Sequence, residues 1–377
     1  MILSDVCEFI VDCPHSTAPD EGEGYPLIRT PNVGKGRLDL NGVHRVSESV
    51  YKQRIQRGAP RANDLIFARE APAGNVALVQ ENQTVCLGQR TVLIRPNVQK
   101  VNPQYLVYYL LSPKPQYELL GTANGATVAH VNLPAIRNLK IELPEKSVQD
   151  KIGTILVTYD DLIENNQKQI KLLEEAAQRL YKEWFVDLRF PGHENTKIVD
   201  GVPEGWHRGT VGRIAEFKRG RTITKAQVKG GNVPVVAGGL EPAYYHNVAN
   251  TKAPVITISA SGANAGFVRL YGVDVFASDC SFVDGLGTES LFFVYEFLKE
   301  SKVSIDQLQK GSAQPHVYAK DINAMKITIP EKEYLERFDR YAKVYFNKIK
   351  TLQGQNDRLK TARDLLLPKL MSGEVEV

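Results

Sequence analysis

The chain carries one segment twice, and this repeat limits the folds that it can adopt. "TVAHVNLPAIRNLKIELPEKS" begins at Thr127 and "AQPHVYAKDINAMKITIPEKE" begins at Ala313, and the two align without a gap at a constant spacing of 186 residues. His130 then matches His316, and Pro144 matches Pro330. Because 377 residues suffice for two domains with full cores, the repeat predicts a chain built from two related halves.

A long amphipathic helix is predicted after each copy. Behind Pro144, apolar residues recur every seven residues in two rows, one from Ile152 to Leu180 and one from Leu156 to Trp184. These rows are typical of the a and d positions of a coiled coil. The second copy, from Glu331 to about Met371, has a similar pattern. Each helix would span about 38 residues, or roughly 57 Å, and we expect the two apolar seams to bury each other.

The polar residues in the seams favour an antiparallel pairing. If Trp184 faces Phe338, then Asn166 faces Asn356 and most other pairs are apolar. The exception is Tyr159 opposite Arg363. A single buried polar pair fixes the register of a coiled coil at some cost in stability. The alternative is that both asparagines lie at the wet edge of the seam.

The regions before the two helices resemble each other more faintly. "VCEFI" at Val6 matches "IAEFK" at Ile214, and "YPLI" at Tyr25 matches "VPVV" at Val233. "LIFAREAPAGNVALV" from Leu65 aligns with "TISASGANAGFVRLY" from Thr257, and each reads as a β-hairpin.

We therefore predict an α+β fold in which two globular domains are joined by two long antiparallel coiled-coil helices, with a pseudo-twofold internal repeat. The predicted parts are a first domain at 1–144, a helix at 145–188, a Pro- and Gly-rich linker at 189–209, a second domain at 210–330 and a helix at 331–373. The residues before each helix are predicted to be core positions of a strand: Ile136, Leu139 and Ile141, and Ile322, Met325 and Ile327.

Composition excludes some classes of protein and leaves others open. A net charge of +4 permits nucleic-acid binding without demanding it. No apolar run approaches the roughly 18 residues of a membrane span, and the N-terminus lacks the basic start of a secretory signal. The four cysteines form no Cys-x-x-Cys pair, so we expect neither a zinc site nor disulfides, and a reducing cytoplasm as the location. For His130 and His316 we expect a structural role or a phosphate neighbour rather than a metal site.

These segments together resemble the DNA-specificity subunit of type I restriction-modification systems. The resemblance covers essentially the whole chain and rests on "GATVAHVNLPAIRNLKIELP", "GSAQPHVYAKDINAMKITIP", the helix after each, "VPEGWHRGTVGRIAEFKRG" from Val202, and the closing "LLLPKLMSGEV". The first half departs from the pattern, because it begins at "ILSDVCEFI" without the Pro-x-Gly-Trp motif of the second.

The resemblance implies a function and a set of partners. Each globular domain would be a target-recognition domain that reads half of a bipartite site in double-stranded DNA, and the helices would hold the unread spacer. The subunit would be non-catalytic and hold no cofactor. It would seat a methyltransferase subunit, in two copies, which binds S-adenosylmethionine, and a restriction subunit could join. Trp184 and Phe185 could pack the helix end or serve as a platform for the methyltransferase.

Sequence-specific reading needs side chains that reach base edges, together with Lys and Arg on phosphates. The loops "IRTPNVGKGRL", "YKQRIQRGAPR", "FKRGRTITK" and "PAYYHN" and the two hairpin turns offer such side chains. The hairpin turns "FAREAPAG" and "SASGANAG" differ, which predicts two different half-sites. The candidate DNA-binding residues are Arg29, Thr30, Asn32, Lys35, Arg37, Arg54, Arg57, Arg61, Arg69, Arg90, Lys218, Arg219, Arg221, Thr224, Lys225, Tyr245, His246, Ser259, Ser261 and Asn264.

Two other classes of protein compete with this interpretation. An enzyme is disfavoured, because the chain has no Gly-x-x-x-x-Gly-Lys-Ser/Thr loop, no Asn-Pro-Pro-aromatic stretch and no Gly-x-Ser-x-Gly motif. We therefore assign no catalytic and no metal-binding residue. The second alternative is a non-catalytic coiled-coil scaffold that links proteins without sequence-specific DNA binding. A steep dependence of DNA affinity on salt would separate the two, because phosphate contacts release counterions.

Overall fold

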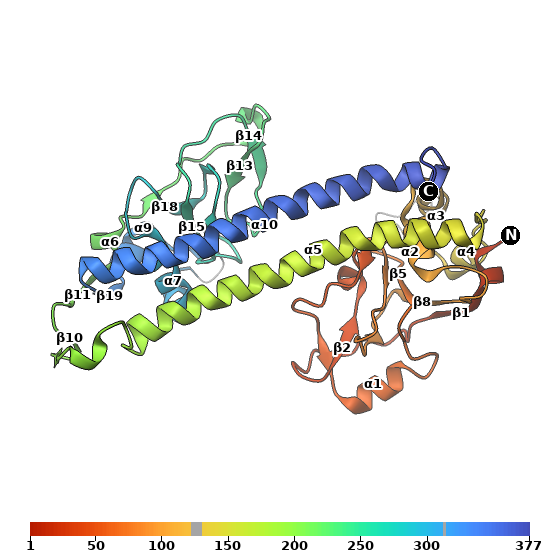
Figure 1. The fold of residues 1–377 in the computed structure, drawn as a ribbon, viewed down its shortest axis with the longest axis horizontal. Coiled ribbons are helices and arrows are strands. Elements are labelled where there is room, and N and C mark those ends of the chain that lie inside the picture. The colour runs from red at the N-terminus through yellow and green to blue at the C-terminus, as the bar shows by residue number, and fades with distance from the viewer. Residues whose placement is uncertain (122–129, 312–313) are drawn as a thin grey trace. The chain divides into compact units, whose positions relative to one another are not determined.

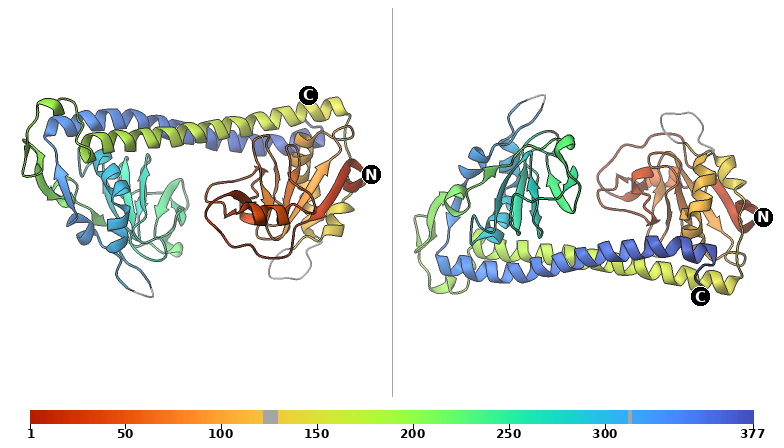
Figure 2. Two further views of the ribbon diagram at one scale, coloured as in Figure 1. Left: turned by 90° about the horizontal axis from the view of Figure 1, so that it is seen from below. Right: turned by 90° about the horizontal axis from the view of Figure 1, so that it is seen from above.

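A computed structural model of the chain describes residues 1–121, 130–311 and 314–377. Its contacts divide it into two units: unit 1 comprises Met1–Asn165 and Gln355–Val377, and unit 2 comprises Asn166–Gly354. The division falls inside both long helices (Figure 1), so each unit combines one globular part with a piece of each helix. Both chain termini belong to unit 1 (Figure 2). The first residues of the duplicated segments, 127–129 and 313, lie outside the described residues.

The globular part of unit 1 is built from two sheets. The larger has the strand order β1-β8-β5-β6-β3 and the smaller β4-β2-β7. The strands are β1 (Cys7–Asp12), β2 (Tyr25–Ile28), β3 (Gly36–Arg37), β4 (Arg45–Val46), β5 (Leu65–Ala68), β6 (Val76–Leu78), β7 (Cys86–Leu87) and β8 (Thr91–Pro96). The helices are α1 (Glu48–Arg54), α2 (Pro103–Leu111), α3 (Pro113–Gly121) and α4 (Leu133–Arg137), with 3-10 turns at Leu3–Val6 and Thr30–Asn32.

The core of unit 1 lies between its larger sheet and α2. β5 is buried along its whole length, as expected for a Leu-Ile-Phe-Ala strand in the middle of a sheet. α2 begins where it does because Pro103 suits the first turn of a helix and the Asn102 side chain accepts a hydrogen bond of 2.9 Å from the Tyr105 N–H. Leu106 and Leu110 of α2 share one core with Leu65 and Val76 of the sheet.

Unit 2 repeats this architecture. Its larger sheet has the order β12-β18-β15-β16 and its smaller sheet β14-β13-β17, beside the pairs β11-β19 and β10-β9. The strands are β9 (Ile198–Val199), β10 (Val202–Pro203), β11 (His207–Thr210), β12 (Lys218–Arg219), β13 (Val233–Val236), β14 (Tyr244–His246), β15 (Val255–Ser259), β16 (Val268–Tyr271), β17 (Phe276–Ala277), β18 (Cys280–Asp284) and β19 (Lys326–Ile329). The helices are α6 (Val211–Ile214), α7 (Leu291–Glu300), α8 (Lys302–Gln307) and α9 (Ala319–Asn323), with 3-10 turns at His193–Asn195 and Lys225–Gln227.

The strand pairing shows that the two units share one topology. In unit 1, β2 pairs antiparallel with β4 and parallel with β7. In unit 2, β13 pairs antiparallel with β14 and parallel with β17. The faint sequence match of Tyr25 with Val233 therefore corresponds to equivalent strands, and the predicted α+β class is confirmed.

Both predicted hairpins are present, with a small correction to their alignment. β5 pairs antiparallel with β6, and β15 pairs antiparallel with β16. Ala68 N–H donates to Asn75 O, whereas the equivalent Ser259 N–H donates to Phe267 O, so the second turn is one residue longer. The sequence alignment of Leu65 with Thr257 is therefore wrong by one residue, and Leu65 corresponds to Ile256.

The duplicated segments dock on these hairpins in the same way. Val131 N–H donates to Arg69 O, and Val317 N–H donates to Ala260 O, each at 3.0 Å. The predicted strand before each helix is only partly right. Ile136 and Ile322 are buried core residues as predicted, but they lie in the short helices α4 and α9. In α4 the cause is Pro134, which suits the first turn of a helix.

The strand predicted before each long helix is present in only one of the two duplicated segments. Ile327 lies in β19, which pairs with β11. The equivalent Ile141 is buried, but it lies outside any strand. Its neighbour Lys140 pairs with Ile2 in a single isolated bridge, which is too short to count as a strand. Leu139 is also buried, and Met325 is partly buried against the core of unit 2.

The two long helices are α5 (Lys146–Tyr181), which continues as a π-helical turn at Lys182–Val186, and α10 (Lys332–Ser372). In unit 1, Leu156 near the start of α5 shares a core with Leu370 at the end of α10. In unit 2, Tyr181 at the end of α5 packs against Phe338 near the start of α10. The helices therefore run in opposite directions. Among the described residues, none of the helices is long and apolar enough to cross a bilayer.

The seam contains polar residues of two kinds. Asn166 and Asn356 are buried, at 8% and 5% exposure, but they belong to different units, so their pairing stays a prediction. Arg363 is predicted to lie opposite Tyr159. It forms an ion pair with Asp160, the next residue in α5. Trp184 is buried in the core of unit 2, against Phe185 and Phe338.

Candidate nucleic-acid interface

At one end of the larger sheet of unit 1, two turns meet the duplicated histidine. The hairpin turn after β5 contributes Arg69 and Glu70, the turn before β8 contributes Arg90, and His130 lies just before Val131. Arg69 N–H donates to Arg90 O at 2.9 Å, which joins the two turns. We call these four side chains the turn edge of unit 1.

Charged contacts connect the turn edge. Glu70 accepts a hydrogen bond from His130 Nδ1 and forms an ion pair of 3.0 Å with Arg90. Arg69 Nη2 lies 2.8 Å from His130 Nε2. An imidazole that donates from Nδ1 and accepts at Nε2 satisfies both neighbours, so this geometry fits neutral His130. The histidine therefore has a structural role in unit 1.

The two arginines of the turn edge differ in what they can reach. Arg69 is 11% exposed, forms an ion pair of 2.7 Å with Asp12 and donates from Nε to Val131 O at 2.8 Å. It fixes the duplicated segment to the sheet. Arg90 is 60% exposed, so its guanidinium reaches solvent. Of the two, only Arg90 can meet a ligand without breaking the core.

The same end of the sheet in unit 2 carries different side chains. Asp279 precedes β18 as Arg90 precedes β8, and Ala260 N–H donates to Asp279 O at 3.3 Å. Ser261 Oγ donates to the Asp279 carboxylate. Ser259 Oγ donates to Gly238 O at 3.1 Å, and Asn264 Nδ2 donates to the same oxygen at 3.4 Å. The turn edge of unit 2 is therefore Ser259, Ser261, Asn264 and Asp279.

A basic loop lies beside this edge. Lys218, Arg219, Arg221 and Lys225 are exposed, and in the part of the chain that the structure describes none of them forms an ion pair. The loop is held by its backbone, because Gly220 N–H donates to Cys280 O at 2.8 Å and Arg221 N–H donates to Ala277 O at 2.9 Å. It therefore runs along the residues on either side of Asp279, with its cations free for a polyanion.

The remaining candidates of unit 2 are partly structural. Thr224 is exposed, and its N–H donates to Gln227 Oε1 at 2.9 Å at the start of the 3-10 turn. Tyr245 is exposed, whereas His246 is buried and its Nδ1 accepts from Lys229 N–H at 3.1 Å. Burial raises the pKa of the Cys280 thiol to about 12, so this neighbour of Asp279 is a neutral thiol.

The loop "IRTPNVGKGRL" of unit 1 is more buried than its composition suggests. Thr30 is buried and donates from Oγ1 to Ala71 O at 3.3 Å, and Asn32 is buried and accepts from Arg29 N–H at 3.1 Å. Arg29 is half-buried. Lys35 is exposed, and Arg37 forms an ion pair with Asp161 on α5. This loop therefore fixes the domain to α5 more than it faces solvent.

The arginines around α1 also differ in how exposed they are. Arg54 is buried and donates to Ser16 O at 2.5 Å, so it ties the loop after β1 to α1. Arg57 and Arg61 are exposed, although Arg57 donates to Cys13 O at 3.1 Å and Arg61 pairs with Glu8 at 3.1 Å. Both retain surface that a phosphate could approach.

The candidates fall into three groups by exposure. Exposed are Lys35, Arg57, Arg61, Arg90, Lys218, Arg219, Arg221, Thr224, Lys225 and Tyr245; half-buried are Arg29, Arg37, Ser261 and Asn264; buried are Thr30, Asn32, Arg54, Arg69, His246 and Ser259. Sequence reasoning missed Glu70 and Asp279, because an isolated acidic residue gives no signal of DNA binding. Within the described residues, no three His, Cys, Asp or Glu side chains gather as they would around a metal ion.

Comparison with other proteins assigns the chain to a family. The model of the type I restriction modification DNA specificity domain matches residues 1–175 and again residues 203–361. The chain belongs to this type I specificity family.

Relatives in the type I specificity family cover nearly the whole chain. The type I restriction enzyme MjaIX specificity subunit of Methanocaldococcus jannaschii is 28% identical over 362 residues, covering 89% of this chain and 83% of that protein. The putative MjaX specificity subunit of the same organism is 24% identical, covering 100% of this chain and 93% of that protein. The crystal structure of a type I restriction-modification S subunit from M. genitalium has the same fold, with a TM-score of 0.61 and 18% identity over 98% of this chain and 95% of that one.

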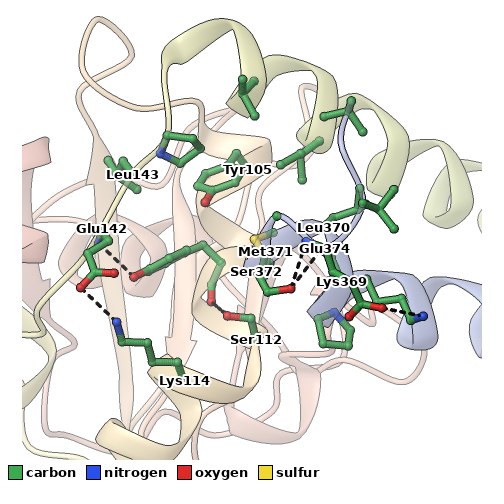
Figure 3. Close-up of a pocket in the computed structure, with 18 of the residues that line it drawn as sticks. Tyr105, Ser112, Lys114, Glu142, Leu143, Lys369, Leu370, Met371, Ser372 and Glu374 are labelled. Atoms are coloured by element: carbon green, nitrogen blue, oxygen red, sulfur yellow. Dashed lines mark hydrogen bonds and ion pairs between the residues drawn. The ribbon is translucent and has the colours of Figure 1, made fainter.

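Unit 1 of this type I specificity chain also contains a cavity of about 970 Å³ (Figure 3). Tyr105 of α2, Val148 and Ile152 of α5, and Leu370 and Met371 of α10 line it, with the C-terminal residues up to Val377. At its rim Lys114 pairs with Glu142 at 3.1 Å, and Glu142 N–H donates to the Tyr109 hydroxyl.

The equivalent place in unit 2 is filled by aromatic rings. Tyr334 and Phe338 match Val148 and Ile152 at the spacing of 186 residues. Tyr334 packs against Phe190, with ring centroids 4.9 Å apart, and against Trp206, at 5.8 Å. The cavity therefore belongs to the packing of the helix ends. Its two lysines, Lys114 and Lys369, are paired with Glu142 and Glu374, so the cavity does not suit a phosphate.

Proposed function

We propose that this chain is the sequence-specific DNA-binding specificity subunit of a type I restriction-modification complex, in which each unit reads one half of a bipartite, asymmetric target. One observation carries the proposal. The same place in one shared topology holds Arg90 in unit 1 and Asp279 in unit 2. Two copies of one fold that present opposite charges at the same edge are suited to two different half-sites.

The basic loop of unit 2 supports DNA as the partner. Lys218, Arg219, Arg221 and Lys225 are exposed cations outside any ion pair among the described residues, and cations in this state gain most from phosphate oxygens. In unit 1 we assign phosphate contacts to Lys35, Arg57 and Arg61, which are exposed. The buried candidates act by shaping these loops.

The helices provide the spacing between the half-sites in this proposal. α5 and α10 would form an antiparallel coiled coil with a pseudo-twofold axis, with Asn166 opposite Asn356. The opposite directions of the helices support it, as does the burial of both asparagines. Such a pair of helices would hold a fixed number of unread base pairs between the half-sites and seat two methyltransferase subunits.

The chemistry belongs to the partners in this proposal. The chain itself would be non-catalytic and hold no cofactor. The methyltransferase subunit would bind S-adenosylmethionine and methylate adenine, and a restriction subunit would complete the complex. The names of the relatives, which are type I restriction enzyme specificity subunits, support this division of labour.

Methylome sequencing tests the proposal. Cells that make the full chain with its neighbouring methyltransferase subunit are compared with cells that make the methyltransferase alone. We expect a new N6-methyladenine motif that is split by a fixed run of unread bases and whose halves differ. No new motif in the presence of folded methyltransferase would favour the coiled-coil scaffold, and a perfectly palindromic motif would contradict the asymmetry of the two units.

A further inference from the structure

We propose that Arg90 and Asp279 are the base-reading residues of the two units, Arg90 for guanine and Asp279 for a base that presents an amino group in the major groove, cytosine or adenine. This inference rests on the proposed function and adds the chemistry of the two half-sites. It arises from three observations: the geometry at Arg90, the surroundings of Asp279 and the equivalence of their backbone positions.

The backbone at Arg90 is in an unusual conformation. Its φ of 64° lies in the left-handed region, which residues other than glycine rarely adopt. Backbone strain of this kind is concentrated at functional sites. Here the conformation places a long cationic side chain at the end of the sheet with 60% of its surface exposed. The turn therefore presents Arg90 outward instead of packing it.

Glu70 holds the Arg90 guanidinium at one nitrogen and leaves the others available. The ion pair of 3.0 Å joins Arg90 Nη1 to Glu70 Oε2, while the other Glu70 oxygen is engaged by His130. Among the described residues, no group accepts a hydrogen bond from Arg90 Nη2 or Nε, so both remain as donors. A planar fork of donors matches the N7 and O6 acceptors that guanine presents in the major groove. Cytosine and adenine present an amino donor instead and would be disfavoured.

Asp279 carries a negative charge, whereas the loop beside it is basic. Its carboxylate is half-buried and accepts from Ser261 Oγ at Oδ2, whereas no side chain that the structure describes donates to Oδ1. The basic loop runs beside it, since Gly220 N–H donates to Cys280 O, directly after Asp279, and Arg221 N–H donates to Ala277 O, two residues before it. A carboxylate close to DNA phosphates is repelled by them. It suits a DNA interface if it accepts a hydrogen bond from a base amino group, as carboxylates do from cytosine N4.

The backbone makes the two positions equivalent. Arg69 N–H donates to Arg90 O in unit 1, and Ala260 N–H donates to Asp279 O in unit 2. Each residue directly precedes the strand at the same place in its sheet, β8 or β18. The same readout position therefore carries a donor group in one unit and an acceptor group in the other.

Selection from a library of DNA duplexes with randomised bases tests the inference. The full chain, assembled with its methyltransferase subunit, is compared with Arg90→Gln and Asp279→Asn. The controls are Lys114→Gln, which removes a cation that is also 60% exposed and paired with a glutamate, and Asp306→Asn, which removes an ion-paired carboxylate from α8. Bound duplexes are sequenced.

Each variant should change one half-site only. We expect Arg90→Gln to reduce the preference for guanine at one position of one half-site about tenfold or more, with the other half-site unchanged. Asp279→Asn should relax one cytosine or adenine in the other half-site to a similar extent. The two controls should leave both half-sites unchanged.

The outcomes separate failure of the inference from failure of the proposed function. If the wild-type chain selects a bipartite motif and both half-sites persist unaltered in Arg90→Gln and Asp279→Asn, the base-reading assignment is overturned and the proposed function stands. A uniform loss of affinity with unchanged base preference would also overturn the assignment, because it is the signature of a phosphate contact. A wild-type chain that selects no motif would overturn both.

Discussion

Arg363 of α10 forms an ion pair with Asp160 of α5, and both side chains are almost removed from water, at 12% and 3% exposure. The Tyr108 hydroxyl of α2 donates to the other carboxylate oxygen of Asp160 at 2.6 Å. Burial raises the pKa of Tyr108, and the negative charge of Asp160 adds to that effect, so Tyr108 remains a hydrogen-bond donor. One carboxylate thus joins both long helices to the globular part of unit 1.

Replacing Arg363 should destabilise unit 1 strongly. Arg363→Met leaves the buried Asp160 carboxylate without its cation, which typically costs about 3–5 kcal/mol. Arg358→Met, at an exposed arginine five residues earlier in α10, should change the free energy of unfolding by about 0.5 kcal/mol or less. Urea unfolding followed by circular dichroism measures both. Equal stability of the two variants would show that the ion pair contributes nothing.

Removing the Phe338 ring should open the aromatic core of unit 2. Phe338 is fully buried and contacts Phe185, with ring centroids 5.3 Å apart, and Tyr181, at 6.0 Å. Phe338→Ala should cost about 3–5 kcal/mol through the cavity that it leaves. Tyr341→Ala, at a ring that is 43% exposed on the same helix, should cost about 1 kcal/mol or less. Thermal unfolding would contradict the prediction if both variants melted together.

The stability of unit 2 should fall as the pH rises through neutrality. Burial raises the pKa of Glu296 from 4.5 to about 8, with Glu174 and Glu300 adding to the rise and Lys299 opposing it. Between these two values the folded chain keeps a proton that the unfolded chain releases, so raising the pH favours unfolding. Above about pH 8 both states are ionised, and the loss stops growing.

Glu296→Gln should remove the contribution of Glu296 to this loss, while Asp339, whose pKa burial raises to about 7, keeps its own. The variant should match the wild type near pH 4 and exceed it by on the order of 2–4 kcal/mol at pH 8, because each pKa unit corresponds to about 1.4 kcal/mol. Glu289→Gln, at an exposed position, serves as the control. Unfolding midpoints measured at several pH values give the result. A wild type and Glu296→Gln variant that differ equally at all pH values would refute the role of this proton.

Arg221 should contribute to DNA affinity without contributing to sequence preference. Arg221→Gln should weaken binding to all duplexes alike. The plot of log affinity against log salt should become less steep by about one, because one phosphate contact is lost. Lys252→Gln provides the control, since Lys252 pairs with Asp274 and lies at the opposite end of β15. Titration of labelled DNA at several salt concentrations measures the slope. An unchanged slope would place Arg221 away from the phosphates.

The sequence predicted the elements of the fold that depend on periodicity. The heptads from Ile152 to Trp184 predicted α5, because burial of one helix face imposes the period. The apolar runs that begin at Leu65 and Thr257, each broken by a turn of small residues, predicted the hairpins. The hairpin alignment failed by one residue, since turn length depends on backbone hydrogen bonds rather than on apolar pattern. The strand expected at Ile136 failed because Pro134 favours a helical turn.

The candidate site was harder to predict, because exposure depends on tertiary partners. Arg54 and Arg90 look alike in the sequence, yet Arg54 is buried by carbonyl oxygens of the Pro14–Ser16 loop, which is distant along the chain. Arg69 is likewise engaged by Asp12. Asp279 becomes informative only when the shared topology shows that its position in unit 2 is equivalent to that of Arg90 in unit 1. Basic loops could be found from composition, whereas the charge of the readout position required the strand pairing.

The hydrogen bonds from Val131 to Arg69 O and from Val317 to Ala260 O have a consequence for evolution. Both hydrogen bonds join main-chain atoms, so they do not depend on whether the accepting residue is an arginine or an alanine. In unit 1 the Arg69 side chain adds a second bond, from Nε to Val131 O. This main-chain part of the attachment is thereby insulated from mutation at the turns. Such a chain can acquire a new DNA target through a few codons while its folding stability and its assembly remain under separate selection.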